Sequence, residues 1–179
     1  MHHEENIPKR RAHRPIKRRT RGLRNAADHE SPLRNRVRRA APIPEGIYLT
    51  MVSDLKELYK ISIRRWRKHM SGVAYELTYQ DGRIKRLISA PRPRSPVSAC
   101  IFLHEVGHHA IGFRRYAPRC LEEYFVWQWV FREMANRSIP IDERVHKHYR
   151  RSMHHYVKLA RRESHHIPHE LHQFTHWPG

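Results

Sequence analysis

The chain has little cysteine, no long hydrophobic run and no stretch that resembles a secretory signal. Its only cysteines, Cys100 and Cys120, are too few for a disulfide framework, which agrees with a reducing compartment. No apolar run approaches the roughly eighteen residues of a membrane span. Acidic residues near the N-terminus also argue against a transit peptide. These absences predict a cytoplasmic protein that works without a membrane.

Acidic residues are scarce relative to basic ones: 36 Lys and Arg stand against 17 Asp and Glu, a net charge of +19. Residues 1–40 hold 13 of these basic residues and only 4 of the acidic ones. Because residues 1–44 have few large apolar side chains and no aromatic one, they cannot bury enough surface to offset the entropy of ordering. We expect a basic, flexible arm that contacts nucleic acid through phosphates, with a purely solvated extension as the alternative.

The globular part is predicted to begin near Pro44 with two helices. Ser53-Asp54 is expected to cap the first, and the second is expected to run from Ser62 to about Met70. This pair loosely suggests a helix-turn-helix because the second element is rich in basic residues. Simple packing of both helices on the core is the other interpretation.

A β-hairpin is predicted next. Residues 73–79 and 84–88 alternate between apolar and polar side chains, and Asp81-Gly82 between them favours a type I′ turn. An edge strand of this kind can pair with an extended peptide.

The hairpin leads into a strongly apolar predicted helix, with Ser95 as N-cap, Pro96 at its first position and Gly112 as its end. It contains the sequence His-Glu-Val-Gly-His over residues 104–108. Two histidines four positions apart share one helical face, so His104 and His108 are candidate ligands of one metal ion. Glu105 is the candidate general base, an arrangement typical of zinc-dependent peptidases. The alternative is a structural helix with two hydrogen-bonded core histidines.

Catalytic zinc normally has three protein ligands, so a third group must come from another segment. The metzincin spacing would require Gly and His where this chain has Ile111 and Arg114. Glu122 and Glu123 lie near the start of the next predicted helix, residues 120–135, and either can reach back. Cys120 is a softer alternative ligand.

With these motifs the chain resembles the ImmA/IrrE family of zinc peptidases over residues 45–140. In that family the helix after H-E-x-x-H carries Glu-x-x-Ala-Asn/Asp-x-Phe-Ala, and its first Glu binds zinc. The resemblance implies Glu123 as the third ligand, with Glu122 as the alternative, and places Trp127 at the Asn/Asp position. It also implies a regulatory protease that cuts a specific intracellular protein, such as a repressor.

Two further regions carry candidate chemistry. Arg114, Arg115 and Tyr116, in the loop after the metal helix, either stabilise an oxyanion or are ordinary surface residues. Residues 141–179 form a basic, histidine-rich helical region in which Pro168 starts a last short helix. A solvated tail or partner-binding face is favoured there over a second metal site.

Together these features predict an α+β fold: a small zincin-like domain, mainly helical, with a β-hairpin before the metal helix. The predicted parts are an arm (1–44), a metallopeptidase domain (45–140) and a helical C-terminal region (141–179). The predicted function is zinc-dependent (Zn²⁺) cleavage of a protein substrate. The competing hypothesis is a non-catalytic nucleic-acid-binding protein with a structural metal site.

Overall fold

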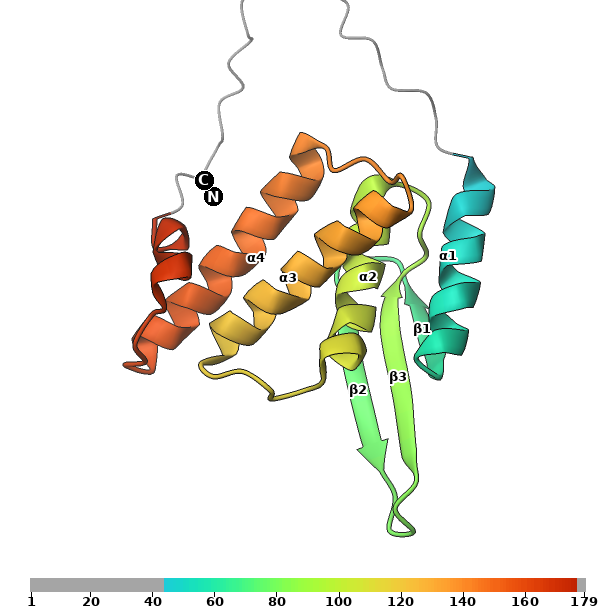
Figure 1. Ribbon diagram of the computed structural model, residues 1–179, viewed down its shortest axis with the longest axis horizontal. Coiled ribbons are helices and arrows are strands. Elements are labelled where there is room, and N and C mark those ends of the chain that lie inside the picture. The colour runs from blue at the N-terminus through green and yellow to red at the C-terminus, as the bar shows by residue number, and fades with distance from the viewer. Residues whose placement is uncertain (1–43, 177–179) are drawn as a thin grey trace, which may run out of the picture. The chain divides into compact units, whose positions relative to one another are not determined.

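The computed structural model describes residues 44–176 of the chain (Figure 1). The predicted arm lies outside the described residues except for Pro44, so its binding to nucleic acid stays a prediction. The described residues belong to one compact unit. They form a mixed α+β fold that is mainly helical, as predicted, with the elements α1 (Glu45–Leu58), β1 (Ile61–Arg67), β2 (Val73–Thr78), β3 (Ile84–Pro91), α2 (Pro96–Ile111), α3 (Arg119–Asn136), α4 (Glu143–Arg162) and the 3₁₀ helix η1 (His169–Phe174).

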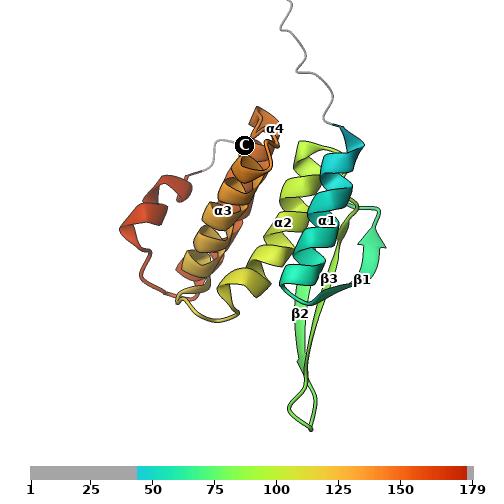
Figure 2. The same ribbon diagram turned by 45° about the vertical axis from the view of Figure 1, so that its right-hand side comes forward.

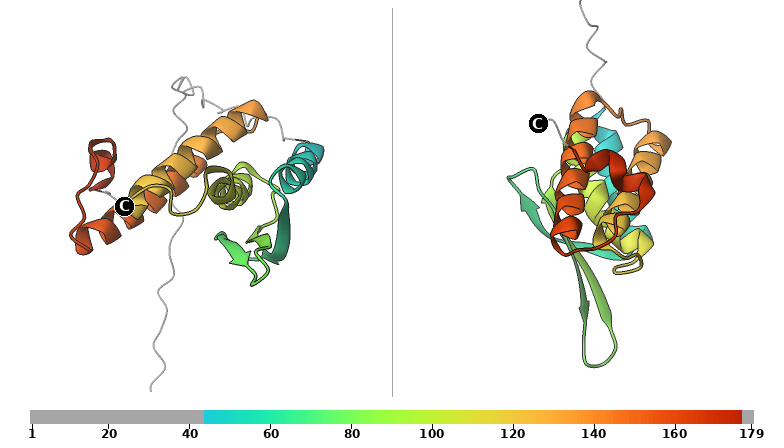
Figure 3. Two further views of the ribbon diagram at one scale, coloured as in Figure 1. Left: turned by 60° about the horizontal axis from the view of Figure 1, so that its bottom comes forward. Right: turned by 90° about the vertical axis from the view of Figure 1, so that its left-hand side faces the viewer.

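The sheet has three strands in the order β1-β3-β2, and the helices lie on one side of it (Figures 1 and 2). β2 and β3 form the predicted antiparallel hairpin, whereas β1 pairs with β3 in parallel. α2 packs on β3 and also contacts α3 and α4, so α2 lies between the sheet and the other two helices (Figure 3). β2 is therefore an edge strand beside α2.

The prediction of a second helix from Ser62 to about Met70 is wrong, because most of that segment forms the strand β1. Ile63 pairs with Ile88 and Trp66 with Ala90, while the register shifts at Arg64 between them. This bulge places two apolar residues on the same side of the strand three positions apart, which imitates helical spacing. The helix-turn-helix suggestion fails with it, since its second element is a strand.

The hairpin turn also differs from the predicted type I′ geometry. The backbone N–H of Gly82 donates to Tyr79 O at 3.0 Å, and that of Tyr79 donates to Arg83 O at 2.9 Å. Of the two residues Asp81 and Gly82, only Gly82 has a positive φ, 80°. A type I′ turn needs two such residues, whereas a three-residue loop needs a single left-handed one, which glycine adopts without strain.

The first helix begins at Glu45, directly after Pro44, and not at Ser53-Asp54. Asp54 lies inside α1, where its Oδ2 is 3.3 Å from Nη1 of Arg137. The stripe that faces the core extends upstream of the expected cap at helical spacing, with buried Tyr48, Met51 and Leu55.

The ends of α2 confirm the predictions made for them. Ser95 Oγ accepts a hydrogen bond from the backbone N–H of Ser98 at 3.3 Å, and Pro96 occupies the first turn. Gly112 ends the helix with a φ of 88°. These local signals fix where the histidines of α2 stand along its axis.

The C-terminal region is helical, as predicted, and its apolar side chains join the core of the compact unit. Asp142 caps α4 by accepting from the backbone N–H of Val145 at 3.0 Å, and η1 follows Pro168 and packs on α4 (Figure 3). Buried residues of these two elements are Val145, Met153, Val157, Ala160, Leu171 and Phe174. Over the described residues, no helix combines the length and apolar character that a membrane crossing requires.

Candidate metal centre

His104 and His108 lie one turn apart on the face of α2 that meets α3. Their ring centroids are 4.9 Å apart and the rings are nearly perpendicular, at 88°. Both side chains are buried. Imidazole nitrogens of mostly buried side chains need partners that replace the water they have lost.

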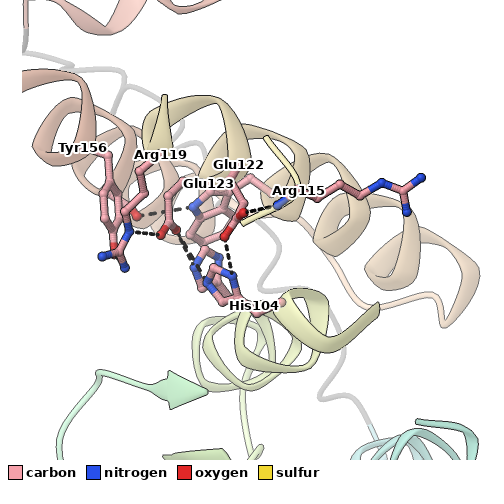
Figure 4. Close-up of polar contacts among 9 residues, drawn as sticks. His104, Arg115, Arg119, Glu122, Glu123 and Tyr156 are labelled. Carbon is pink, nitrogen blue, oxygen red and sulfur yellow. Dashed lines mark hydrogen bonds and ion pairs between the residues drawn. The ribbon is translucent and has the colours of Figure 1, made fainter. Parts of the chain in front are cut away.

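Glu123, near the start of α3, supplies the carboxylate that both imidazoles face (Figure 4). Its Oε2 lies 3.1 Å from Nε2 of His104 and 3.7 Å from Nε2 of His108. The ligand atoms of the three residues lie within 4.8 Å of one another, the one such group that the described chain contains. This buried group can hold a metal ion, and two imidazoles with one carboxylate are a known catalytic zinc set.

Glu122 is buried beside Glu123 but has different partners (Figure 4). Its Oε2 accepts from the backbone N–H of Arg115 at 3.0 Å, and its Oε1 lies 3.8 Å from Nδ1 of His108. Glu122 therefore faces the nitrogen of His108 that points away from Glu123. Nδ1 of His108 makes no hydrogen bond among the described residues, so Glu122 stands beside this histidine as a neighbouring charge and does not belong to the group of three.

Arg119 and Tyr156 lie on the other side of the Glu123 carboxylate (Figure 4). Nε of Arg119 is 3.3 Å from Glu123 Oε1, and its guanidinium lies 5.0 Å from the centroid of the Tyr156 ring. Burial alone would raise the pKa of Glu123, but the His104 hydrogen bond and the neighbouring positive charges outweigh it and lower that pKa. Glu123 is thus held ionised, the form that binds metal.

Glu105 lies next to the group, on the neighbouring face of α2, and is buried. Burial is the main cause that raises the pKa of its carboxyl to about 7. Gly72, just before β2, touches this carboxylate so closely that any side chain there would collide with it. A carboxyl that exchanges its proton near neutral pH is suited to general base catalysis.

His109, which directly follows the second candidate ligand, does not belong to the group. It is buried, and its Nε2 lies 3.3 Å from the carbonyl oxygen of Leu87 in β3. α2 turns this histidine toward the sheet, opposite to the metal-binding face, so His109 anchors the helix.

Trp127 packs on His104, with ring centroids 4.9 Å apart, and its indole N–H donates to Ser152 Oγ at 3.3 Å. Nδ1 of His104 is buried and has no hydrogen-bond partner among the described residues. The ring therefore holds His104 by packing, where a polar residue would hold it by a hydrogen bond.

Two cavities, of about 570 and about 490 Å³, open on either side of the site. Gly72, His104, Glu105 and Tyr156 line both of them. The side chains of Glu105 and of the candidate ligand His104 therefore border both cavities.

Only two of the three residues predicted to act from the loop after α2 face a cavity. Arg114 and Tyr116 line the larger cavity, whereas Arg115 offers its backbone N–H to Glu122 and its side chain extends away (Figure 4). Cys100 and Cys120 are buried free thiols. Within the described residues, neither they nor the C-terminal histidines form a further cluster able to hold metal.

Sequence reasoning missed Gly72, Arg119, Tyr156 and His148. The last two belong to α4, and His148 lines the smaller cavity beside Trp127. No local motif indicates them, because they reach the site only through the packing of α4 on α3 and α2.

Comparisons of the chain with protein-family models, curated proteins and solved structures give no match. The case for a function therefore rests on the site and on general chemistry.

Proposed function

We propose that the protein is a zinc-dependent endopeptidase that cuts a specific intracellular protein. The observation that carries this is a buried His104, His108 and Glu123 group with Glu105 beside it, open to two cavities. A regulatory substrate is proposed only because the sequence motifs resemble those of the ImmA/IrrE family, for which no family model matches the chain.

In this proposal zinc is held by His104, His108 and Glu123. When bound, zinc supplies Lewis acidity that acidifies a water molecule and polarises a carbonyl group. Structural zinc sites normally have four protein ligands, whereas catalytic ones have three. The group has three members within the described chain, which favours a catalytic site over the alternative of a nucleic-acid-binding protein with a structural metal.

Glu105 takes a proton from the attacking water and then gives it to the leaving amine of the cut peptide bond. Its burial and its pKa of about 7 support this role, because a base is most effective when its pKa lies near the working pH.

Tyr156 donates a hydrogen bond to the oxyanion that forms on the peptide carbonyl. Burial is the main cause that raises its pKa to about 12, so the phenol keeps its proton at neutral pH. It lines both cavities beside Glu105. Donors of this kind contribute roughly 10²–10³ to kcat.

The edge strand β2 positions the substrate. Val73 and Ala74 line the larger cavity, and β2 pairs on one side only, with β3. An extended peptide that pairs with its free edge brings its carbonyl groups past Glu105.

The test compares zinc-loaded wild type with the Glu105→Gln and Tyr156→Phe variants on a peptide mixture of diverse sequence, with new N-termini counted by mass spectrometry. We expect Glu105→Gln to lose roughly 10²–10⁴-fold in rate and to keep its zinc. Cleavage by Glu105→Gln at the wild-type rate would exclude Glu105 as the base. No cleavage by the wild type would contradict the proposed activity.

A further inference from the structure

Arginines stand in the walls of both cavities. Arg114 and Arg119 line the larger cavity, and Arg151 lines the smaller one. Because the two cavities share His104 and Glu105, positive charge flanks the site on both sides.

The walls of the two cavities contain few carboxylates, and none of them pairs with Arg114 or Arg151. The acidic residues that line the cavities are Glu105, the candidate base, and Glu122, which accepts from the backbone of Arg115. Neither makes an ion pair with Arg114 or Arg151. These two guanidinium groups therefore stand in the cavity walls without a carboxylate partner among the described residues, and low-dielectric clefts strengthen the attraction of such a charge for an anionic group.

Two of the three arginines are free to act on a ligand. Arg119 is committed to Glu123 and Tyr156. Arg114 and Arg151 are exposed, and neither makes an ion pair or hydrogen bond to any residue that the structure describes. Arg114 projects from the loop before α3 and Arg151 from α4, so the two approach the site from different elements.

We propose that the cleft selects peptides that carry carboxylate side chains on both sides of the bond to be cut, with Arg114 binding on one side and Arg151 on the other. This inference rests on the proposed peptidase function and names its substrate class. A guanidinium presents a planar set of donors that matches a carboxylate, so each arginine can hold an acidic side chain in a defined position.

A peptide fits these walls better than a nucleic acid. Single strands bind through exposed aromatic platforms on which bases stack. Aromatic side chains of the walls already pack on other rings: the ring centroids of Phe113 and His108 are 5.7 Å apart, and those of Tyr116 and Phe125 are 4.4 Å apart. The edge of β2 offers instead the backbone pairing that an extended peptide uses.

The experiment measures binding to zinc-loaded, full-length Glu105→Gln protein, which should bind peptide without cutting it. Three peptides carry a neutral fluorophore and the same central bond, flanked by Glu, by Gln or by Lys. Fluorescence anisotropy gives their Kd values in the Glu105→Gln background, with and without the added pair Arg114→Glu and Arg151→Glu. The control background carries Arg132→Glu and Lys85→Glu, which change the net charge equally at exposed positions outside both cavities.

We expect the Glu peptide to bind tightest, and the cleft pair to weaken it by roughly five- to thirtyfold, since exposed ion pairs are individually weak. The cleft pair should bring the Lys peptide closer in affinity, and the control pair should change the ranking little. Equal effects of the two pairs, or no preference among peptides, would overturn the inference. A fluorescent single-stranded oligonucleotide is measured in the same assay, and a loss of affinity that the cleft pair causes for this oligonucleotide but for none of the peptides would also overturn the inference.

The same peptides, incubated with the zinc-loaded wild type, separate this inference from the proposed function. Charge-selective binding without cleavage of any peptide would contradict the peptidase and leave the acidic ligand class standing. Cleavage without charge preference would do the reverse.

Discussion

Two neighbouring glutamates of α3 have different surroundings. Glu123 faces both candidate histidine ligands, whereas Glu122 faces the far nitrogen of His108 and a backbone N–H. Successive residues of a helix point about 100° apart, so which of them reaches the metal group depends on how α3 is rotated against α2. Packing of the buried face of α3 sets that rotation, with Val126 and Trp129 lying against Gly107 of α2 and Trp127 lying against His104.

The first prediction separates the two glutamates. Glu123→Ala should abolish tight zinc binding, because it removes a ligand. Glu122→Ala should lower the affinity by only roughly 10–100-fold, because it removes a carboxylate beside His108 and not a ligand. Titration with a competing zinc dye measures both, and a greater loss in Glu122→Ala would reverse the assignment.

Substitution of Gly72 tests the position of Glu105 without removing a candidate metal ligand. A Cβ at this position collides with the carboxylate and with Cγ of Glu105, so the whole side chain of this buried residue must move. We expect Gly72→Ala to lower kcat by at least roughly tenfold while zinc content stays near wild type. Unchanged kcat would show that the position of Glu105 does not limit the reaction.

Among the elements, those with local signals could be predicted from the sequence. α2 has a cap, a proline and a terminal glycine, and the hairpin has alternation around a glycine turn. β1 could not be predicted, because its partner β3 is distant in the chain and its bulge at Arg64 breaks the alternation. His104, Glu105 and His108 could be predicted from the sequence because they form one motif in a single helix. Tyr156 could not, because it belongs to α4 and reaches the site only through helix packing.

The close contact between α2 and α3 depends on the absence of a side chain at Gly107. A Cβ at Gly107 would lie 2.9 Å from Cγ1 of Val126 and 3.1 Å from the ring of Trp129. We expect Gly107→Ala to destabilise the protein by about 1–3 kcal/mol through overpacking, partly offset by the helix propensity of alanine. Urea denaturation of the metal-free protein gives the free energy of unfolding.

The matched control is Gly46→Ala in α1, where nothing lies within 4 Å of the added Cβ. The same substitution should be neutral or stabilising there, by up to about 1 kcal/mol. If the two variants behave alike, the close packing of α2 on α3 is not what Gly107 provides.

Across the whole molecule, the candidate site is assembled from three helices and the segment before β2. α2 gives two histidines and the base, α3 gives a carboxylate, and α4 gives the wall that contains Tyr156. A metal ion at this point ties α2 to α3, so binding should stabilise the folded state as a whole.

Zinc removal should therefore lower the thermal stability. With free zinc about 100-fold above its Kd, linkage gives about 2.7 kcal/mol, or a Tm higher by roughly 5–10 °C for a domain of this size. Calorimetry with and without a chelator measures this shift. The His104→Ala, His108→Ala double variant should show none, and an equal shift in that variant would locate the stabilising metal elsewhere.

The zinc content of the full-length protein, by elemental mass spectrometry after removal of weakly held metal, tests the central claim most directly. We predict about one zinc per chain in the wild type and none in the His104→Ala, His108→Ala variant. The His169→Ala, His172→Ala control, which alters two histidines of η1 outside the group, should keep its zinc. Full zinc occupancy in the His104→Ala, His108→Ala variant would contradict the metallopeptidase account.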